Sequence, residues 1–115
     1  MEIIPFDDFK RMDIRIGTIL AAERIPESDR LLKLFVDFGV DEASVPVQRQ
    51  IVSGIAAWYV PEELTGRQAV FILNLEPKTF RGVESQGMIF AATDAEGRVS
   101  LLRSDHPVPP GASVQ

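Results

Sequence analysis

Apolar and polar residues alternate with a period of two in several short segments of the chain. In the run DIRIGTILAAERI, over residues 13–25, Ile16 and Leu20 would share one face of a strand, with Ile19 on the opposite face. This period is typical of a half-buried β-strand, because successive side chains point to opposite sides of the backbone. Gly17, in the middle of the run, predicts a bulge or a tight bend.

Further runs predict the other strands of a sheet. Residues 31–39 alternate in the same way, residues 47–53 form a third short run, and residues 68–73 are almost continuously apolar. Residues 87–93 and 98–103 flank the turn sequence DAEG, which predicts a hairpin. The chain therefore contains at least five short strands.

Helical signals are few and weak. Ser53 is a suitable N-cap for a short helix over residues 54–59. The sequence PEEL over residues 61–64 places proline and acidic residues in a first turn, and Gly66 then ends it. Residues 74–86 are polar and are expected to form a long loop.

Two segments flank the strands. Residues 3–11 predict a helical turn in which Phe6 and Phe9, three residues apart, pack down together and anchor the start of the chain. Residues 104–115 contain several prolines and are expected to be extended, because proline fixes φ and removes a hydrogen-bond donor.

This order of elements predicts an all-β fold, a five-stranded OB-fold barrel with a short helix between strands 3 and 4 and flanking N- and C-terminal segments. Barrels of this kind bind oligonucleotides and oligosaccharides on a sheet face and in loops. We expect a single domain over residues 1–115, with a core over about 9–103 and a C-terminal extension over 104–115.

Composition excludes several kinds of chemistry. The chain has 115 residues, a net charge of −5, no cysteine and one histidine, His106. Disulfides, thiolate catalysis, cysteine-ligated metals and a site with several histidines are therefore impossible, and we expect no cofactor and no metal. The apolar stretches are too short to cross a membrane and no signal peptide is recognisable, so we expect a cytoplasmic protein.

No catalytic constellation emerges from the remaining residues. Ser53 and Ser85 lie outside the strand–turn–helix context of a nucleophilic serine, and the only histidine is in the tail. Asp37, Asp41 and Glu42 lack the spacing of a calcium loop. We therefore expect a binding protein rather than an enzyme.

Cationic and amide side chains are concentrated around the second and third strands and the long polar loop. They are suited to phosphates and to single-stranded bases. The members of this candidate site are Arg30, Lys33, Arg49, Asn74, Lys78, Arg81, Ser85, Gln86 and Met88.

The spacing of these residues alone leaves a second interpretation open. The charges are also typical of an ordinary solvated face, and Phe80 and Met88 are also typical of a core. If the two apolar residues are exposed beside Arg81, they offer a surface on which a base can stack.

Seven short motifs, in order, resemble the EMAP II/CsaA-type tRNA-binding domain. The most distinctive is RGVESQGMI, over residues 81–89. The others are FKRMDIRIG (9–17), LLKL with VDxG (31–39), IVSGI (51–55), PEELxG (61–66) and NLxP (74–77). The resemblance covers about residues 6–103.

The resemblance implies an OB-fold that binds tRNA by shape, without catalysis. It implies a tRNA face that includes Lys33, Asn74, Arg81, Ser85 and Met88. It also implies a homodimer formed through the segments that flank the barrel, and the length of the chain suggests the free-standing form. Other members of the family are appended to methionyl-tRNA synthetases, and the CsaA branch is described as an export-related chaperone.

Alternatives to a free-standing tRNA-binding protein follow from the departures from the family pattern. Glu76 stands where the family usually has a basic residue, with Lys78 nearby, and the loop 41–46 is unusually acidic. These features, together with the apolar residues expected near the site, motivate a chaperone that binds unfolded polypeptides. A further alternative is a tRNA-binding subunit that acts beside a methionyl-tRNA synthetase.

Overall fold

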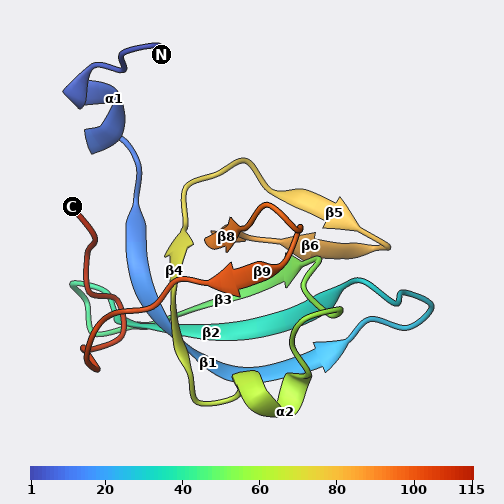
Figure 1. Ribbon diagram of the computed structural model, residues 1–115. Helices are drawn as coiled ribbons and strands as arrows, with labels where there is room; N and C mark the ends of the chain where they lie inside the picture. The colour runs from blue at the N-terminus through green and yellow to red at the C-terminus, as the bar shows by residue number, and fades with distance from the viewer.

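The computed structural model describes all residues, 1–115, and is built almost entirely from strands (Figure 1). Neither of its two short helices has the length and apolarity that crossing a membrane requires. The elements are α1 (Phe6–Lys10), β1 (Ile14–Arg24), β2 (Leu32–Val40), β3 (Pro46–Ser53), α2 (Pro61–Leu64), β4 (Gln68–Ile72), β5 (Lys78–Phe80), β6 (Val83–Ser85), β7 (Met88–Ile89), β8 (Ala91–Thr93) and β9 (Val99–Leu101).

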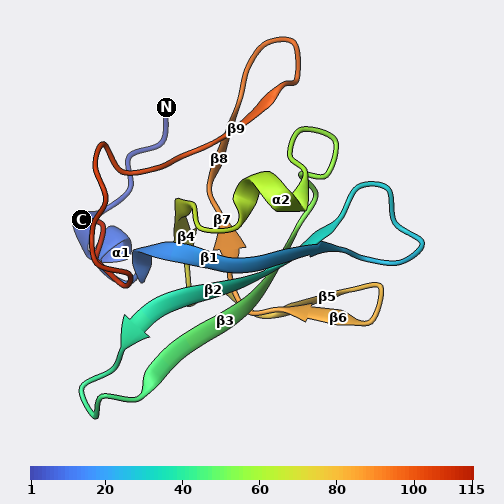
Figure 2. The ribbon, with the colours of Figure 1, turned by 90° about the horizontal axis from the view of Figure 1, so that it is seen from below.

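The main sheet has five antiparallel strands in the order β3-β2-β1-β4-β7, and it curls around a single core. The β5–β6 and β8–β9 hairpins add two small sheets, which Figure 2 shows on opposite sides of the β1–β2–β3 layer. The predicted all-β, five-stranded barrel of the OB type is confirmed, as is the hairpin at the DAEG turn.

Strand β2 supplies much of the core. Leu34 and Val36 are completely buried, and Phe38 is nearly so. The Phe38 ring meets that of Phe71, from β4, edge to face at 5.3 Å between centroids, which is a favourable aromatic geometry. The predicted alternation of β2 is therefore correct, and it places Lys33 and Phe35 on the outer face.

The predicted alternation of β1 is correct as far as Leu20, with Gly17 and Ile19 on the face that meets the core. The pairing of β1 with β2 shifts by one residue between Ile19 and Ala21. Ile19, before the bulge, is completely buried, while Leu20 is 44% exposed. A bulge reverses the face on which every later side chain of the strand lies.

Gly17 lies before the bulge and has a different function from the one predicted. A Cβ atom at this position would lie 2.5 Å from Cγ1 of Val36 and 2.6 Å from the Phe38 ring. Here β1 lies so close to the core side chains of β2 that no side chain fits. Glycine is needed for close approach rather than for a bulge.

Two predictions about local structure are wrong. Residues 54–59 form turns rather than a helix, and the short helix between β3 and β4 is α2. The backbone N–H of Val60 donates to the Glu63 carboxylate at 3.1 Å and begins that helix. Residues 74–86 are not one long loop, since they contain the β5–β6 hairpin. Its short strands were not recognisable because only Phe80 and Val83 are apolar.

The C-terminal tail is only partly extended, since it bends at residues 105–106 and turns at residues 110–111, and it covers an edge of β1. Ile16 N–H donates to the Ala112 carbonyl at 2.9 Å, and Val114 N–H donates to the Ile14 carbonyl at 2.8 Å. These hydrogen bonds pair the backbone groups of β1 that precede the residues paired with β2. The tail therefore completes the barrel.

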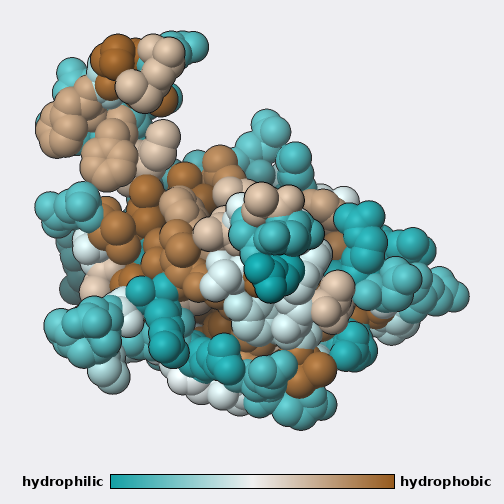
Figure 3. Space-filling model, in the orientation of Figure 1, coloured by the Kyte–Doolittle hydropathy of each residue, from teal (hydrophilic) through white to brown (hydrophobic).

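The N-terminal segment does not anchor to the barrel in the way predicted. No residue of α1 is buried, and Phe6 is 70% exposed. The Phe6 and Phe9 rings do lie near each other, with centroids 6.2 Å apart. We call residues 1–12 the arm. Figure 3 shows the arm projecting from the body, next to a largely hydrophobic area of the barrel surface.

The DAEG turn is held by the carboxylate of Asp94. This carboxylate accepts the backbone N–H of Arg98 at 3.0 Å and that of Glu96 at 2.9 Å, and the Arg98 guanidinium at 2.8 Å. These hydrogen bonds, that of the Arg98 backbone first, lower the pKa of Asp94.

The contact at Gly17 predicts the effect of one added carbon. Gly17→Ala should lower the free energy of unfolding by about 1–3 kcal/mol, because the Cβ atom overlaps Val36 and Phe38. Urea denaturation followed by circular dichroism measures this change. Gly54→Ala is the matched control, since the nearest atom to its Cβ would be 3.9 Å away. An unchanged midpoint for Gly17→Ala would contradict the close contact.

Candidate nucleic-acid interface

The β5–β6 hairpin is fixed against the edge of β3 by backbone and side-chain hydrogen bonds. Gln86 N–H donates to the Gln50 carbonyl at 2.8 Å, and Nε2 of Gln50 donates to the Glu84 carbonyl, also at 2.8 Å. In return, Oε1 of Gln86 accepts the N–H of Gln50 at 3.1 Å. Gln86, a candidate site residue, therefore acts in this structure by holding the hairpin in place.

Ser85 also fixes the hairpin through hydrogen bonds. Its side chain is buried, with Oγ accepting the N–H of Val52 at 2.9 Å and donating to the carbonyl of Gly87 at 2.9 Å. Both hydrogen bonds lie inside the protein. The Ser85 side chain thus fixes the backbone of a candidate RNA face without itself reaching the surface.

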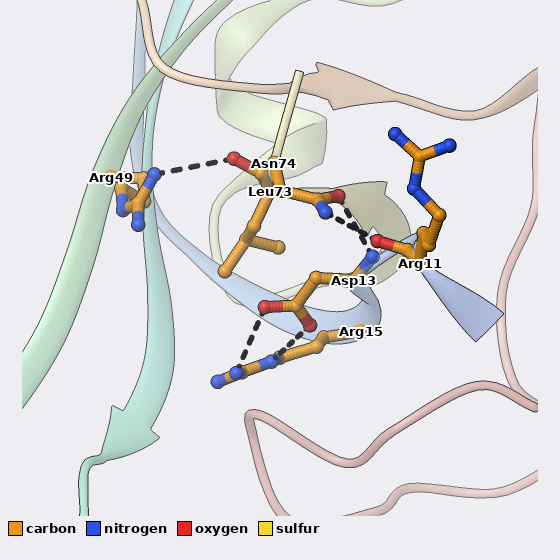
Figure 4. Close-up of polar contacts among 6 residues, drawn as sticks. All are labelled: Arg11, Asp13, Arg15, Arg49, Leu73 and Asn74. Carbon is orange, nitrogen blue, oxygen red and sulfur yellow. Dashed lines mark hydrogen bonds and ion pairs between the residues drawn. The ribbon is translucent and has the colours of Figure 1, made fainter. Parts of the chain in front are cut away.

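The half-buried Arg49 guanidinium joins two chain segments. Its Nη1 atom lies 3.4 Å from the carbonyl oxygen of Leu73, at the end of β4 (Figure 4), and 3.4 Å from that of Gln86. Both are weak hydrogen bonds at the limit of the usual range. Arg49 forms no ion pair, so its positive charge stays uncompensated beside the hairpin.

Asn74 binds the base of the arm. Its Nδ2 donates to the Arg11 carbonyl at 2.6 Å, and its Oδ1 accepts the N–H of Asp13 at 2.8 Å. Figure 4 shows these contacts beside the pair formed by Arg15 and Asp13, at 2.7 Å and 3.0 Å. The side-chain amide of Asn74 therefore links the loop after β4 to the residues at which the arm begins.

Lys33 lies on the outer face of β2 and is already paired. Its Nζ is 2.6 Å from a carboxylate oxygen of Glu23, the residue opposite it on β1, and 5.4 Å from the centre of the Phe35 ring. A phosphate that binds Lys33 must therefore compete with the Glu23 carboxylate. Exposed ion pairs contribute only about 0–1 kcal/mol, so this competition is modest.

Arg30 and Arg81 come together from distant parts of the chain. Both line a hollow of about 310 Å³ between the β1–β2 loop and the tip of the β5–β6 hairpin, and Phe80 and the acidic Asp29 line it too. Arg81 adopts a φ of 51° at the turn of that hairpin. Both side chains are exposed and neither forms an ion pair, so both guanidinium groups are available to an anion.

The two remaining candidates are exposed. Lys78 lies on β5, and Met88, on β7, is 49% exposed. The candidates thus divide into side chains accessible at the surface and side chains that are held in hydrogen bonds within the protein. No three histidine or acidic side chains come close enough together to hold a metal ion.

The candidate set omitted residues that the structure places at the same surface. A groove of about 320 Å³ runs between β2, β3 and β6, and its lining includes Phe35, Gln48 and Gln50 besides Arg49 and Gln86. The alternation of β2 already placed Phe35 on the polar face, beside Lys33. An aromatic residue on a polar strand face was the signal that could have found this groove.

A small β-barrel with uncompensated cations, amide side chains and an aromatic ring on and beside one sheet face has the features of an oligonucleotide-binding module. Residues 14–113 match a family model described as "Putative tRNA binding domain". The chain therefore belongs to this tRNA-binding domain family.

Similar proteins agree with this assignment. The chain is 42% identical to a MetRS-related protein from Pyrococcus horikoshii, with a TM-score of 0.89 and all of both chains covered. The chaperone CsaA from Bacillus anthracis is 32% identical, with a TM-score of 0.84 over 99% of this chain and all of that one.

Curated sequences of high similarity are methionine–tRNA ligases. That of Methanothrix thermoacetophila is 52% identical over 98% of this chain, and that of Flavobacterium johnsoniae is 49% identical over 98%. The chain spans only 16% and 15% of these two relatives, so it corresponds to one part of each.

The Asn74 hydrogen bonds predict how firmly the arm is held. Asn74→Ala removes both bonds, and we expect trypsin to cleave after Lys10 and Arg11 about five to thirty times faster, since one or two hydrogen bonds are lost. Limited proteolysis followed by mass spectrometry measures the rate. Glu76→Ala, an exposed residue of the same loop, should leave it unchanged. Equal rates for both variants would contradict the assigned role of Asn74.

Proposed function

We propose that this protein is a non-catalytic, structure-specific tRNA-binding protein that works as a homodimer in the cytoplasm. The observation that carries the proposal is the match of residues 14–113 to the tRNA-binding domain family. The guanidinium groups of Arg30 and Arg81, which form no ion pair and share one hollow, support it, because arginine binds phosphate through two parallel hydrogen bonds.

The candidate residues have two roles in this proposal. Arg30, Lys33, Lys78, Arg81 and Met88 contact the RNA. Positioning residues, Arg49, Asn74, Ser85 and Gln86, set the shape of the hairpin and of the loop after β4 that present them. Phosphate contacts carry little sequence information, so a protein that relies on them recognises the arrangement of the phosphates in space. Such recognition requires a rigid surface.

The net charge of −5 does not oppose binding at a local cationic surface. At physiological salt, charges farther apart than about 8 Å are largely screened from one another. A few cations on each subunit form a weak site, and a dimer presents two such sites to one large RNA, which raises the overall affinity.

The arm supports the dimer. Its exposed apolar side chains are unusual for a monomer, since together they form a projecting hydrophobic group. They are Met1, Ile3, Ile4, Phe6, Phe9 and Met12. A second copy that packs against the arm and the neighbouring hydrophobic area in Figure 3 would bury them.

Salt dependence tests tRNA binding directly. If each subunit contacts two or three phosphates, the logarithm of the association constant should fall against the logarithm of salt concentration with a slope of roughly −3 to −4, at about 0.7 per phosphate. Filter binding of bulk tRNA over a salt series measures this slope. Absence of saturable binding at low salt would reject the proposal.

A matched pair of variants locates the interface. Arg30→Ala should make the slope shallower by about 1.4, because a dimer loses two phosphate contacts. Arg103→Ala removes the same charge from an exposed position beyond β9 and should leave the slope unchanged. Equal slopes for the two variants would remove Arg30 from the interface.

The dimer has its own test. Phe6→Asp places a charge in the middle of the arm, and we expect sedimentation to show a monomer that binds tRNA at least about tenfold more weakly, since avidity is lost. Val40→Asp makes the same change at an exposed apolar position of the barrel and should remain dimeric. A wild-type protein that sediments as a monomer would contradict the dimer.

Similarity to the chaperone CsaA favours a second candidate function, the binding of unfolded polypeptides by the same apolar arm. In this case the protein should suppress aggregation of a chemically unfolded enzyme, as light scattering measures, and excess tRNA should not compete. Phe6→Asp should abolish this suppression. Absence of suppression by the wild type would exclude this function.

The similarity to methionine–tRNA ligases supports a third arrangement, in which the protein brings tRNA to a methionyl-tRNA synthetase. An immobilised sample should then retain the synthetase from a cell extract treated with ribonuclease. Failure to retain it would leave the protein acting on tRNA alone.

A further inference from the structure

Phe35 is an aromatic residue on the outer, polar face of β2. It is 39% exposed, while its neighbours along the strand, Leu34 and Val36, are completely buried. It contributes nothing to the core, and an exposed aromatic ring costs free energy that a binding partner can recover. Its presence among polar neighbours therefore calls for a role at the surface.

The residues around Phe35 leave the ring accessible. Across the sheet its neighbours are Ala21 on β1 and Gln50 on β3. Ala21 is too small to cover a ring. The side-chain amide of Gln50 is drawn toward the hairpin, because its Nε2 donates to the Glu84 carbonyl. Lys33, held by Glu23, places its ammonium over the ring, 5.4 Å from the ring centre, so a base stacks beside this ammonium or displaces it.

Beside the ring lies the groove of about 320 Å³ between β2, β3 and β6, where Phe35 is the one hydrophobic residue of the lining. The rest are amides and charged groups: Gln48, Arg49, Gln50, Glu84 and Gln86. Amides can both donate to and accept from the edge of a base. The Glu84 carboxylate repels a phosphate, so the groove suits the uncharged base of a nucleotide better than its backbone.

We propose that Phe35 is a stacking platform for one unpaired nucleobase of the bound RNA, with Lys33, on the same face of β2, near a phosphate beside that base. This inference rests on the proposed tRNA function and adds to it a contact with a single-stranded nucleotide. Stacking on an aromatic side chain tolerates any base, which agrees with recognition of RNA by shape.

The test uses three RNA probes with the full-length protein: a twelve-nucleotide oligoadenylate, an abasic oligomer of equal length, and bulk tRNA. The wild type should bind oligoadenylate more tightly than the abasic oligomer, which has the same phosphates. Phe35→Leu, which keeps an apolar side chain on the strand, should bind oligoadenylate about 5- to 150-fold more weakly, the effect of losing one stacked base. Phe35→Tyr should stay within about twofold of the wild type.

A spectroscopic signal separates stacking from a purely structural role. In the double variant Phe35→Trp with Trp58→Phe, the only tryptophan lies on the platform, and oligoadenylate should quench its fluorescence while the abasic oligomer should not. Thermal unfolding of every variant checks that the sheet is intact.

The outcomes distinguish this inference from the proposed function. Unchanged affinity of Phe35→Leu for oligoadenylate and tRNA, together with unquenched fluorescence of the double variant, would overturn the platform while tRNA binding stands. Absence of tRNA binding by the wild type, with oligoadenylate binding that still depends on the ring, would overturn the proposed function and retain the platform for another single-stranded nucleic acid.

Discussion

The close approach of β1 to the core side chains of β2 at Gly17 is the constraint on which the barrel depends. β1 pairs with β4 over its first part and with β2 over the rest, so the curl of the sheet is concentrated in this one strand. The missing side chain at Gly17 makes room for Val36 and Phe38, and the bulge after Ile19 then turns the strand. The tail covers the part of β1 that this bend leaves without a neighbour.

The strongly curled five-stranded sheet determines where the polar residues of its outer face and edge lie. Ser85, Gln86 and Arg49 use their hydrogen bonds to join the hairpin to β3 and to the end of β4. This leaves a rigid edge from which Arg30 and Arg81, on two distant segments, meet in one hollow. In a protein with an excess of acidic residues, a few uncompensated cations held in fixed positions matter more for binding RNA than the total charge.

Much of the fold is predictable from the chain itself. The period of two in β2 correctly predicted its buried face, and the DAEG sequence correctly predicted the hairpin turn, because burial of alternate side chains and turn chemistry are local properties. The bulge of β1 was expected at Gly17 but lies after Ile19, since its position depends on pairing with β2 rather than on residues nearby. The β5–β6 hairpin was missed because its strands are short and are stabilised by β3, from a distant part of the chain.

The sequence by itself determined the main strands along the chain, the barrel class and the family, as well as the residue types available at the face, because these follow from periodicity and from motifs in register. Only the tertiary structure decided which side chains are free. It showed that the amide of Asn74 is occupied by the base of the arm, that Lys33 is paired with Glu23, and that Phe35 lies open beside a groove. The physical reason is that a hydrogen-bond partner or an open neighbour comes from a segment distant in the chain, which no local pattern encodes.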